Sequence, residues 1–326
     1  MKALILAGGL GTRLRPLTYT RPKHLLPIAN VPHIEHVFHL LQRHGVDHVV
    51  LLTSHLAEAF SSVVLEAQDR GMRVDITHEP EPLGTAGALR NAVEFVGSET
   101  FLAFNGDILS DMDLSSLLDL HRERSAEATI VLTPVEDPSA YGVVPTNEDG
   151  RVLGFIEKPA PGEASTKLVN AGIYVMEASV LDRIPRGRVY SAEHQLFPEL
   201  AEAGRLYARA GDGYWMDIGT PQKYLQANLD ALAGRYETPA VPLPANDLVL
   251  AGDGARVDPD ARVSSACLGP GASVGAGAVV QRCVLLAGAS VGPGARVEES
   301  ILGEGAVVEA GARLSAATLA DNETVE

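Results

Sequence analysis

A glycine-rich segment close to the N-terminus has the composition of a phosphate-binding loop. The apolar run Lys2–Leu6 predicts a strand, and the sequence GGLGTRL follows at residues 8–14. Glycines let the backbone turn sharply and approach an anion, and successive amide N–H groups can then surround phosphate oxygens. A dinucleotide fingerprint needs a glycine in place of Leu14, and a Walker loop needs a Gly-Lys dipeptide that the sequence lacks. The sequence therefore predicts a phosphate loop of a third type, with a glycine turn that binds nothing as the alternative.

The charge distribution also indicates an anion at this end of the chain. The 326 residues carry a net charge of −16, yet no acidic residue occurs among residues 1–34. The basic residues of this stretch are Lys2, Arg13, Arg15, Arg21 and Lys23. A purely basic segment in an acidic protein is expected to meet an anion. The net charge disfavours a general nucleic-acid binder, and the apolar start is too short for a signal peptide or a membrane span.

The elements that must position this loop alternate between two hydrophobic patterns. From residue 1 to about 236, short apolar or β-branched runs are separated by stretches with helical spacing, which predicts an α/β domain with a largely parallel sheet. The predicted strands are Lys2–Leu6, His48–Thr53, Val74–Thr77, Phe101–Phe104 and Thr129–Thr133, and two predicted helices are Ile34–His44 and Ala86–Val96. Ligands of such sheets bind beyond the carboxyl ends of the strands.

A change in composition predicts a second domain. The proline-rich stretch Thr238–Ala245 has the character of a stiff linker, and Gly-, Ala- and Val-rich sequence follows it. Aliphatic residues recur at positions 263, 280, 297 and 314. These positions are 17 residues apart, and within each period an aliphatic residue occurs about every six residues. This pattern predicts a three-sided β-solenoid, and a disordered tail is the alternative. Cys267 and Cys283 are then small wall residues, because their spacing fits neither a disulfide framework nor a zinc site, and a reducing cytoplasm is the expected compartment.

The motifs of the first domain resemble those of the sugar-nucleotide pyrophosphorylases, a family of nucleotidyltransferases. GGLGTRLRPLT at 8–18 and RPKHLLPI at 21–28 match the family signature. The resemblance continues through EPLGTAGAL at 81–89, FNGD at 104–107, YGV at 141–143, EKP at 157–159, NAG at 170–172 and WMDIGTP at 215–221. It implies a Rossmann-like nucleotidyltransferase domain at 1–236, a linker at 237–246 and a left-handed β-helix at 247–326. Mannose-1-phosphate guanylyltransferases are the branch that it resembles most.

The resemblance implies a reaction and the residues that carry it. In this family an oxygen of a sugar-1-phosphate attacks the α-phosphorus of a nucleoside triphosphate, and pyrophosphate leaves. Two anions must be positioned and their charge neutralised, with Mg²⁺ as the expected cofactor. The resemblance assigns the metal to Asp107, which follows a predicted strand, and to Asp217. By the same resemblance, Arg13 is expected to bind the β- and γ-phosphates, and Lys23 the α-phosphate. The expected catalytic residues are therefore Arg13, Lys23 and Asp107.

The resemblance also implies the contacts to each substrate. The expected nucleotide-binding residues are Leu6, Ala7, Gly8, Gly9, Gly11, Thr12, Arg13, Glu79, Gly84, Thr85 and Ala86. The expected sugar-phosphate-binding residues are Gly142, Glu157, Lys158 and Asn170. Lys158 would hold the phosphate of the sugar-1-phosphate, although by itself it could be a solvated lysine before a proline turn.

Glu79 occupies the position that faces the base in the family. Guanine presents two adjacent N–H donors, and a carboxylate accepts both. A pyrimidine carbonyl opposite the same carboxylate would leave it partly unpaired, at a cost of about 1–3 kcal/mol. Glu79 therefore favours GTP, and with it mannose-1-phosphate and GDP-mannose. Glucose-1-phosphate with dTTP or UTP is the alternative, and Glu79 could instead be an exposed loop acid.

Other functions are weighed against this one. A solenoid acyltransferase usually needs a histidine as general base, but the last histidine is His194. A solenoid without chemistry is expected to form a homo-oligomer. A non-catalytic regulatory subunit on the same fold is disfavoured because all four expected catalytic and metal residues are present. His36 and His39 have the spacing of a metal pair on a helix, but packing histidines are favoured because no nearby cysteine completes a ligand set.

Overall fold

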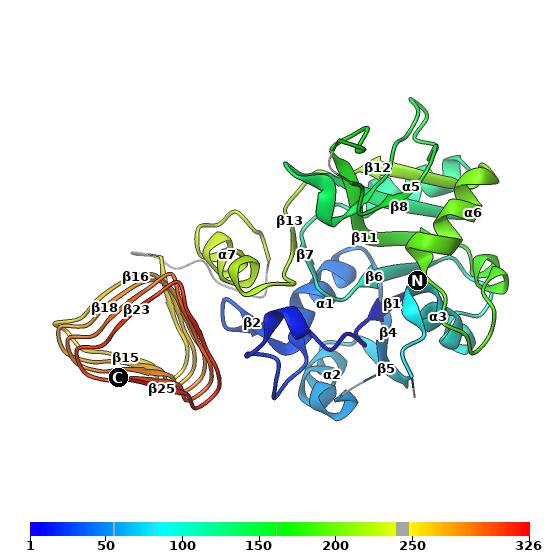
Figure 1. Ribbon diagram of the computed structural model, residues 1–326. Helices are drawn as coiled ribbons and strands as arrows, with labels where there is room; N and C mark the ends of the chain where they lie inside the picture. The colour runs from blue at the N-terminus through cyan, green and yellow to red at the C-terminus, as the bar shows by residue number, and fades with distance from the viewer. Residues whose placement is uncertain (55, 80, 161, 239–247) are drawn as a thin grey trace. The chain divides into compact units, whose positions relative to one another are not determined.

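Strands alternate with helices along the longer N-terminal part of the chain, and a repeating coil follows, as the computed structural model in Figure 1 shows. The structure describes residues 1–54, 56–79, 81–160, 162–238 and 248–326. The predicted linker, residues 237–246, lies outside these ranges except for Glu237 and Thr238. The predicted domain boundaries therefore stay predictions.

The chain divides into two compact units that do not follow the order of the sequence. The sheet unit consists of Met1–Gly9 and Leu40–Trp215, and the solenoid unit consists of Leu10–His39 and Met216–Glu326. The segment that carries Arg13 and Lys23 therefore packs with the C-terminal coils, although it directly follows the first strand.

A mixed sheet forms the centre of the sheet unit. Its strand order is β10-β9-β11-β6-β1-β4-β5, and β8 pairs with both β11 and β12. The strands are β1 (Lys2–Leu6), β4 (His48–Thr53), β5 (Arg73–His78), β6 (Phe101–Asn105), β8 (Ala128–Pro134), β9 (Gly142–Val143), β10 (Ile156–Glu157), β11 (Leu168–Met176) and β12 (Leu206–Ala210). The predicted strands are thus confirmed, and β1 and β4 have the predicted bounds.

The strands that carry the motifs run parallel to one another. β1 lies between β4 and β6, with Leu6 paired to Leu52 on one side and to Asn105 on the other. β5 continues the parallel order beside β4. β11 is antiparallel to both β6 and β8, so the sheet is parallel on one side of β6 and mixed on the other. The four parallel strands therefore end at one edge of the sheet.

Helices connect the strands and cover the sheet. They are α1 (His33–Arg43), α2 (Ser61–Asp69), α3 (Gly84–Asn91), α4 (Val93–Val96), α5 (Ser115–Glu123) and α6 (Phe197–Glu202). The helix predicted at Ile34–His44 is confirmed as α1. The single helix predicted at Ala86–Val96 is wrong in one respect, because Ala92, with φ −92° and ψ 12°, separates α3 from α4. The Ala92 N–H bonds to Leu89 O at 3.2 Å, which tightens the last turn of α3.

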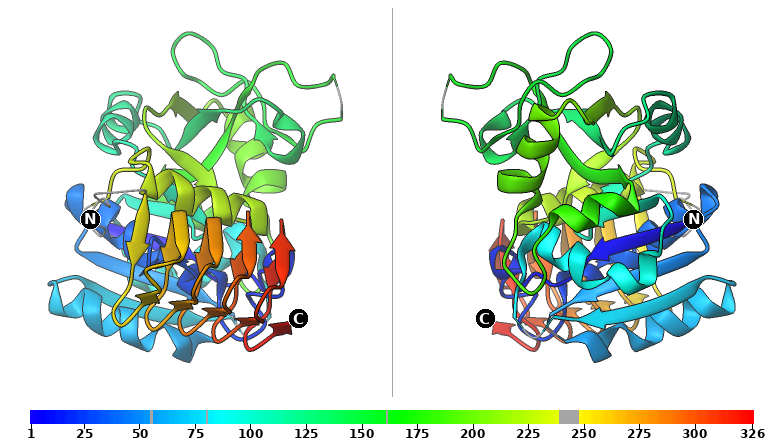
Figure 2. Two further views of the ribbon diagram at one scale, coloured as in Figure 1. Left: turned by 90° about the vertical axis from the view of Figure 1, so that its left-hand side faces the viewer. Right: turned by 90° about the vertical axis from the view of Figure 1, so that its right-hand side faces the viewer.

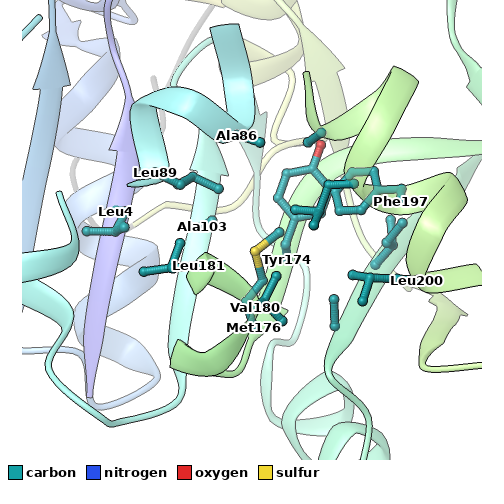
Figure 3. Packing of buried hydrophobic residues seen from close by; sticks show 14 of the residues in the cluster. Leu4, Ala86, Leu89, Ala103, Tyr174, Met176, Val180, Leu181, Phe197 and Leu200 are labelled. Carbon is teal, nitrogen blue, oxygen red and sulfur yellow. The ribbon is translucent and has the colours of Figure 1, made fainter. Parts of the chain in front are cut away.

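The core of the sheet unit joins β11 to the helices on one face of the sheet. Figure 3 shows Tyr174 and Met176 of β11 packed toward Phe197 of α6. The rings of Tyr174 and Phe197 lie 5.1 Å apart between centroids. Tyr174 is fully buried, and its hydroxyl accepts a hydrogen bond from Asn170 Nδ2 at 2.9 Å. Buried aromatic contact of this kind holds β11 in place beside the predicted sugar-phosphate residues.

The C-terminal coils form a three-sided parallel β-helix. Figure 1 shows the coils end-on as a triangle, and Figure 2 shows their strands side by side in chain order. The register pairs Val263 with Val280, Val280 with Val297, and Val297 with Leu314, which confirms the predicted period. The strands are β14 (Val249–Ala251), β15 (Arg256–Val257), β16 (Arg262–Leu268), β17 (Ser273–Val274), β18 (Val279–Leu285), β19 (Ser290–Val291), β20 (Arg296–Glu298), β21 (Ile301–Leu302), β22 (Val307–Val308), β23 (Arg313–Ser315), β24 (Thr318–Leu319) and β25 (Thr324–Val325).

Both cysteines lie in the wall of this helix as buried free thiols, as expected. Burial raises the pKa of Cys267 to about 12 and that of Cys283 to about 11. Cys283 Sγ lies 3.1 Å from Gln281 O, and one coil later Ser300 Oγ donates to Glu298 O at 2.7 Å. Cys283 and Ser300 therefore occupy equivalent positions in successive coils and contact equivalent carbonyl groups.

The N-terminal segment of the solenoid unit packs against helix α7 (Pro221–Leu232) and the coils. Buried Asn228 of α7 accepts the Ala29 N–H at 2.8 Å, and the Tyr224 hydroxyl donates to Pro27 O at 2.7 Å. Asn30 Nδ2 donates to Leu268 O of the solenoid at 2.9 Å. These contacts hold the hairpin of β2 (Pro27–Ile28) and β3 (Val31–Pro32) against the C-terminal residues.

We expect Ser300→Ala to destabilise the solenoid. Ser300 is fully buried, and its hydroxyl also accepts the Ala317 N–H at 3.1 Å. Alanine would remove that acceptor from a buried amide, at a cost of about 1–3 kcal/mol in the free energy of unfolding. Urea unfolding followed by circular dichroism measures the change. Ser315→Ala, at an exposed position of β23, is the control, and equal unfolding midpoints for the two variants would contradict the assignment.

Candidate active site

The carboxyl edge of the parallel strands collects the first group of predicted site residues. Gly8 follows β1, and Ser54 follows β4. The Ser54 hydroxyl donates a hydrogen bond to Gly8 O. A Cβ on Gly8 would lie 3.0 Å from Ser54 Oγ, so the close approach of these two strand ends favours glycine. Asp107 lies in the turn between β6 and β7 (Ile108–Ser110), one residue beyond Gly106, whose N–H donates to Leu6 O at 3.0 Å. Asp107 therefore stands at the expected edge of the sheet.

Glu79 is buried at the end of β5, and a loop turns around it. Its backbone N–H donates to Thr53 O at 2.8 Å, and its Oε2 accepts the Leu83 N–H at 3.1 Å. Burial raises the pKa of the Glu79 carboxyl above its usual range. The alternative of an exposed loop acid is therefore wrong for Glu79. The hydrogen bond from Leu83 fixes one oxygen of the carboxyl group beside the start of α3.

The start of α3 approaches a second loop closely. Gly84 has φ 74°, and a Cβ there would lie 2.9 Å from Tyr190 O. The Tyr190 N–H donates to Leu83 O at 2.8 Å, and Gly87 N–H donates to Tyr190 O at 3.0 Å. The glycines of the GTAGAL motif are therefore required by backbone packing in this structure.

A second group of predicted residues gathers around Glu157. Strand pairing places Glu157 opposite Gly142, and a Cβ on Gly142 would lie 2.8 Å from Glu157 Oε2. Lys158 Nζ is 3.6 Å from Glu157 Oε1, and 68% of the Lys158 side chain is exposed. Burial, and after it the charge of Glu193, raises the pKa of the Glu157 carboxyl. A half-buried acid with an exposed cation beside it can accept hydrogen bonds from hydroxyl groups while the cation binds an anion.

Asn170 lies on β11, which is separated from Glu157 by strand β9. Its Oδ1 accepts the Gly172 N–H at 2.9 Å, and its Nδ2 donates to Tyr174. Asn105, at the end of β6, has a buried Oδ1 for which the described residues provide no hydrogen-bond partner. A Cβ on Gly172, whose φ is 74°, would lie 2.8 Å from Asn105 Nδ2. Both amides bond to the Tyr174 hydroxyl and the charge of Glu157 acts on it as well, so the three side chains form a polar wall in which Asn105 Oδ1 is an acceptor without a partner among the described residues.

Glu193 belongs to this wall, and the sequence analysis missed it. Thr85, a predicted nucleotide contact, donates to Glu193 Oε2 at 2.6 Å and accepts the Ala192 N–H at 2.7 Å. The Ser191 hydroxyl donates to the same Glu193 oxygen at 2.7 Å. The pairing spans 108 residues of sequence, so no spacing pattern indicates it. In the structure, Glu193 lies in the π-helical turn Ala192–Leu196, and turns of this kind often occur at functional positions.

Arg13 and Asp217 lie together in the solenoid unit. A Cβ on Gly219 would lie 2.7 Å from both Arg13 Nη2 and Asp217 Oδ1, so glycine leaves room for the two side chains. Asp217, the last residue of β13 (Trp215–Asp217), accepts the Gly219 N–H at 2.9 Å and lies 3.3 Å from Lys223 Nζ. A carboxylate and two cationic side chains thus lie close together at the start of α7.

Lys23 lies beside the glycine turn of the same unit. Gly11 has φ 61°, in the left-handed region that favours glycine, and a Cβ there would lie 3.4 Å from Lys23 Cβ. The Thr18 hydroxyl donates to Gly11 O at 2.8 Å and closes the loop. Arg15, which has no predicted contact with substrate, lies 5.3 Å over the ring of Tyr19.

The predicted residues therefore form two groups, one in each compact unit. The first consists of Leu6, Ala7, Gly8, Gly9, Glu79, Gly84, Thr85, Ala86, Asp107, Gly142, Glu157, Lys158 and Asn170, and the second of Gly11, Thr12, Arg13, Lys23 and Asp217. Glu193 joins the first group, and Lys223 joins the second.

The histidines of α1 are packing residues where the structure describes their contacts. His36 Nε2 lies 3.1 Å from Ile28 O, and its ring meets Tyr236 edge-on at 5.5 Å. Burial lowers the pKa of His36 to about 4. Within the described ranges, no group of three or more His, Cys, Asp or Glu residues is arranged to hold a metal ion, and no helix is long and apolar enough to cross a bilayer.

Two family models match the sequence. Residues 2–234 match the model described as nucleotidyl transferase, and residues 245–326 match the model described as GMPPB C-terminal domain.

The chain is also similar to curated proteins. A mannose-1-phosphate guanylyltransferase of Mycobacterium tuberculosis is 40% identical over 261 residues, which cover 79% of this chain and 72% of that protein. A UTP–glucose-1-phosphate uridylyltransferase of Synechocystis is 40% identical over 256 residues, which cover 74% of this chain and 66% of that protein. The chain spans 63% to 72% of the length of such relatives.

A solved structure also resembles the chain. HddC from Yersinia pseudotuberculosis, complexed with GMP-PN, aligns with a TM-score of 0.60 and 29% identity, and the alignment covers 70% of this chain and 97% of that one.

We expect Glu193→Gln to lower the pKa of Glu157, because the charge of Glu193 opposes ionisation of the neighbouring carboxyl. A raised carboxyl pKa means that the free energy of unfolding increases as the pH falls through it, and the variant should weaken this pH dependence. Carboxyl chemical shifts of ¹³C-labelled glutamate measure the pKa directly. Glu202→Gln, at an exposed position of α6, is the control. The same titration midpoint for Glu157 in both variants would show that the two carboxyls do not interact.

Proposed function

We propose, because the chain belongs to the nucleotidyl transferase family, that it joins a nucleoside triphosphate to a sugar-1-phosphate and releases pyrophosphate. The family match over residues 2–234 is the observation that supports this class of reaction. The specific reaction that we propose is the synthesis of GDP-mannose from GTP and mannose-1-phosphate, as the name of the mycobacterial relative suggests.

The proposed reaction needs no protein nucleophile. A phosphate oxygen of the sugar-1-phosphate forms a bond to the α-phosphorus, and the bond from the α-phosphorus to the oxygen that bridges to the β-phosphorus breaks. The protein contributes positioning and charge stabilisation. Arg13 binds the β- and γ-phosphates of the leaving pyrophosphate, and Lys23 binds the α-phosphate, where charge builds in the transition state. The proximity of Lys23 to Gly11 supports a common anion site for the lysine and the loop amides.

The sugar-phosphate half of the site follows from the wall around Glu157. We assign the sugar hydroxyls to Gly142, Glu157 and Asn170, and the sugar phosphate to Lys158. The exposed Lys158 ammonium, 3.6 Å from the Glu157 carboxyl, can reach an anion while Glu157 accepts from a hydroxyl. The nucleotide contacts that we propose are Leu6, Ala7, Gly8, Gly9, Gly11, Thr12, Arg13, Glu79, Gly84, Thr85 and Ala86.

Asp107 and Asp217 have the donor chemistry that Mg²⁺ prefers. Asp217 is held as an oxygen ligand by Gly219 N–H and Lys223, and Asp107 supplies a second carboxylate at the carboxyl edge of the sheet. Two carboxylates are a typical protein contribution to an Mg²⁺ site, with phosphate oxygens and water as the remaining ligands. When bound, Mg²⁺ neutralises the charge of the triphosphate.

Glu79 supports guanine as the base. Its carboxyl group is buried, and Leu83 N–H occupies Oε2, which leaves acceptor capacity for a neighbouring donor pair. The raised pKa of this carboxyl indicates a desolvated site, in which an unmatched partner is costly. The uridylyltransferase among the relatives favours UTP with glucose-1-phosphate as the second candidate.

We propose that the solenoid supports a homo-oligomer, because its exposed faces carry no catalytic histidine and solenoids of this kind need covering surfaces. A cytoplasmic setting agrees with two buried cysteines that are free thiols.

A matrix of nucleoside triphosphates against sugar-1-phosphates, scored by pyrophosphate release with Mg²⁺, tests the reaction. We expect the highest kcat/KM with GTP and mannose-1-phosphate. Lys23→Ala should lower kcat by about two to three decades, because a cation at the developing charge is lost, while circular dichroism remains unchanged. Pyrophosphate release by Lys23→Ala at the wild-type rate would remove Lys23 from the mechanism, and no release by the wild-type protein with any pair would overturn the function.

Glu79→Gln tests the base. An amide donates as well as accepts, so we expect the ratio of kcat/KM for GTP to that for UTP or dTTP to fall about 10- to 100-fold. Competition between the triphosphates with saturating sugar-1-phosphate measures the ratio. Glu81→Gln, at an exposed position two residues further on, is the matched control. An unchanged ratio in Glu79→Gln would mean that the base is recognised elsewhere.

A further inference from the structure

We propose that Glu304 and Asp321 of the β-helix are positioning residues for Lys23: they bind Arg21 and thereby hold the segment that presents Lys23 to the triphosphate. This inference rests on the proposed function, in which Lys23 binds the α-phosphate. It gives the solenoid a task in turnover within its own chain, in addition to any role in assembly.

Two carboxylates on successive coils bind one guanidinium. Arg21 Nη1 donates to Glu304 Oε1, and Arg21 Nη2 donates to Asp321 Oδ2 at 2.6 Å. The Thr20 hydroxyl donates to the same Asp321 oxygen at 2.6 Å. The side chains of Arg21 and Asp321 are only 16% and 11% exposed, whereas that of Glu304 is 47% exposed, so the Asp321 contact is the sheltered one. Charge-assisted hydrogen bonds in so sheltered a place are stronger and less screened than surface ion pairs.

The solenoid also holds the acids themselves in place. Asp321 Oδ1 accepts the Glu304 N–H at 2.8 Å, across the step from one coil to the next. Burial opposes ionisation of Asp321, but hydrogen bonds from Thr20 and Glu304 and the charge of Arg21 together hold its pKa below the usual range. The anchor is therefore a fixed carboxylate that belongs to the regular repeat.

The link from Arg21 to Lys23 is short and stiff. Only Pro22 separates them, with φ −60° and ψ 142°, and its ring fixes φ. Lys23 then opens a tight turn in which Leu25 N–H donates to Pro22 O at 3.0 Å. Lys23 also lies close to Gly11: a Cβ added to Gly11 would be 3.4 Å from Lys23 Cβ. A displacement of Arg21 would therefore move both the lysine and the glycine turn, and misplacement by about 1 Å can lower a rate about 100-fold.

Other contacts hold the far end of the segment, so the acid pair can be removed without releasing all of it. Ala29 N–H bonds to Asn228, Asn30 to Leu268 O, and Pro27 O to Tyr224. Variants of Glu304 and Asp321 should thus alter position, not folding.

The test compares the full-length double variant Glu304→Gln/Asp321→Asn with the wild type. We expect kcat to fall about 10- to 100-fold, with KM for the sugar-1-phosphate nearly unchanged and the same thermal midpoint. Asp321→Glu should recover part of the loss. Arg21→Gln should lose as much kcat as the double variant, and combining them should add little, because all three groups form one interaction. Glu299→Gln, which removes the exposed partner of Arg282 on the same solenoid, is the control and should leave kcat unchanged.

Hydrogen exchange provides a readout that does not need activity. Amides of residues 10–26 should exchange about tenfold faster in the double variant and at the wild-type rate in Glu299→Gln. Unchanged exchange, or a kcat within twofold of the wild type, would overturn the inference. If the wild-type protein releases no pyrophosphate with any substrate pair, the proposed function fails, and the exchange experiment still decides whether the acid pair holds the segment.

Discussion

Parallel hydrogen bonding on both sides of β1 is the constraint on which the sheet unit depends. β1 is bonded to β4 and β6, and β4 to β5, all in parallel. Parallel neighbours end at a common edge, so Gly8, Glu79 and Asp107 meet there although long crossover connections separate them in sequence. The apolar side chains of β1 and β4 are buried on both faces of the sheet, which holds these two strands in the centre of the core.

Sequence periodicity predicted the parts of the fold that repeat or are fully buried. β1 and β4 have their predicted bounds because uninterrupted apolar runs end abruptly at polar or glycine residues. The solenoid register followed from the recurrence of Val263, Val280 and Val297, because each coil must place an aliphatic side chain inside. The break at Ala92 escaped prediction, since apolar residues on both sides continue the helical period.

The motifs allowed a candidate site to be predicted residue by residue, but they did not indicate its tertiary contacts. Glu193 reaches Thr85 across 108 residues, and Arg21 reaches Asp321 across 300, so neither pairing leaves a local pattern. The buried carboxyls of Glu79 and Glu157 show why such contacts matter. Burial raises both pKa values, so the charged form of each acid is less favourable in the fold than in water, and both acids belong to the proposed substrate site.

The solenoid is not structurally independent of the proposed catalytic residues Arg13 and Lys23. The two family models divide the chain between residues 234 and 245, yet the contacts group Leu10–His39 with the coils. Removing the coils would leave the Arg21 guanidinium without its two carboxylates and Asn30 without Leu268 O. Both side chains would then face water, and the segment that carries Lys23 would lose contacts that hold it in place. A catalytic domain without the solenoid would therefore need other residues at positions 21 and 30, which makes these two positions the place where the two parts of the sequence are adapted to each other.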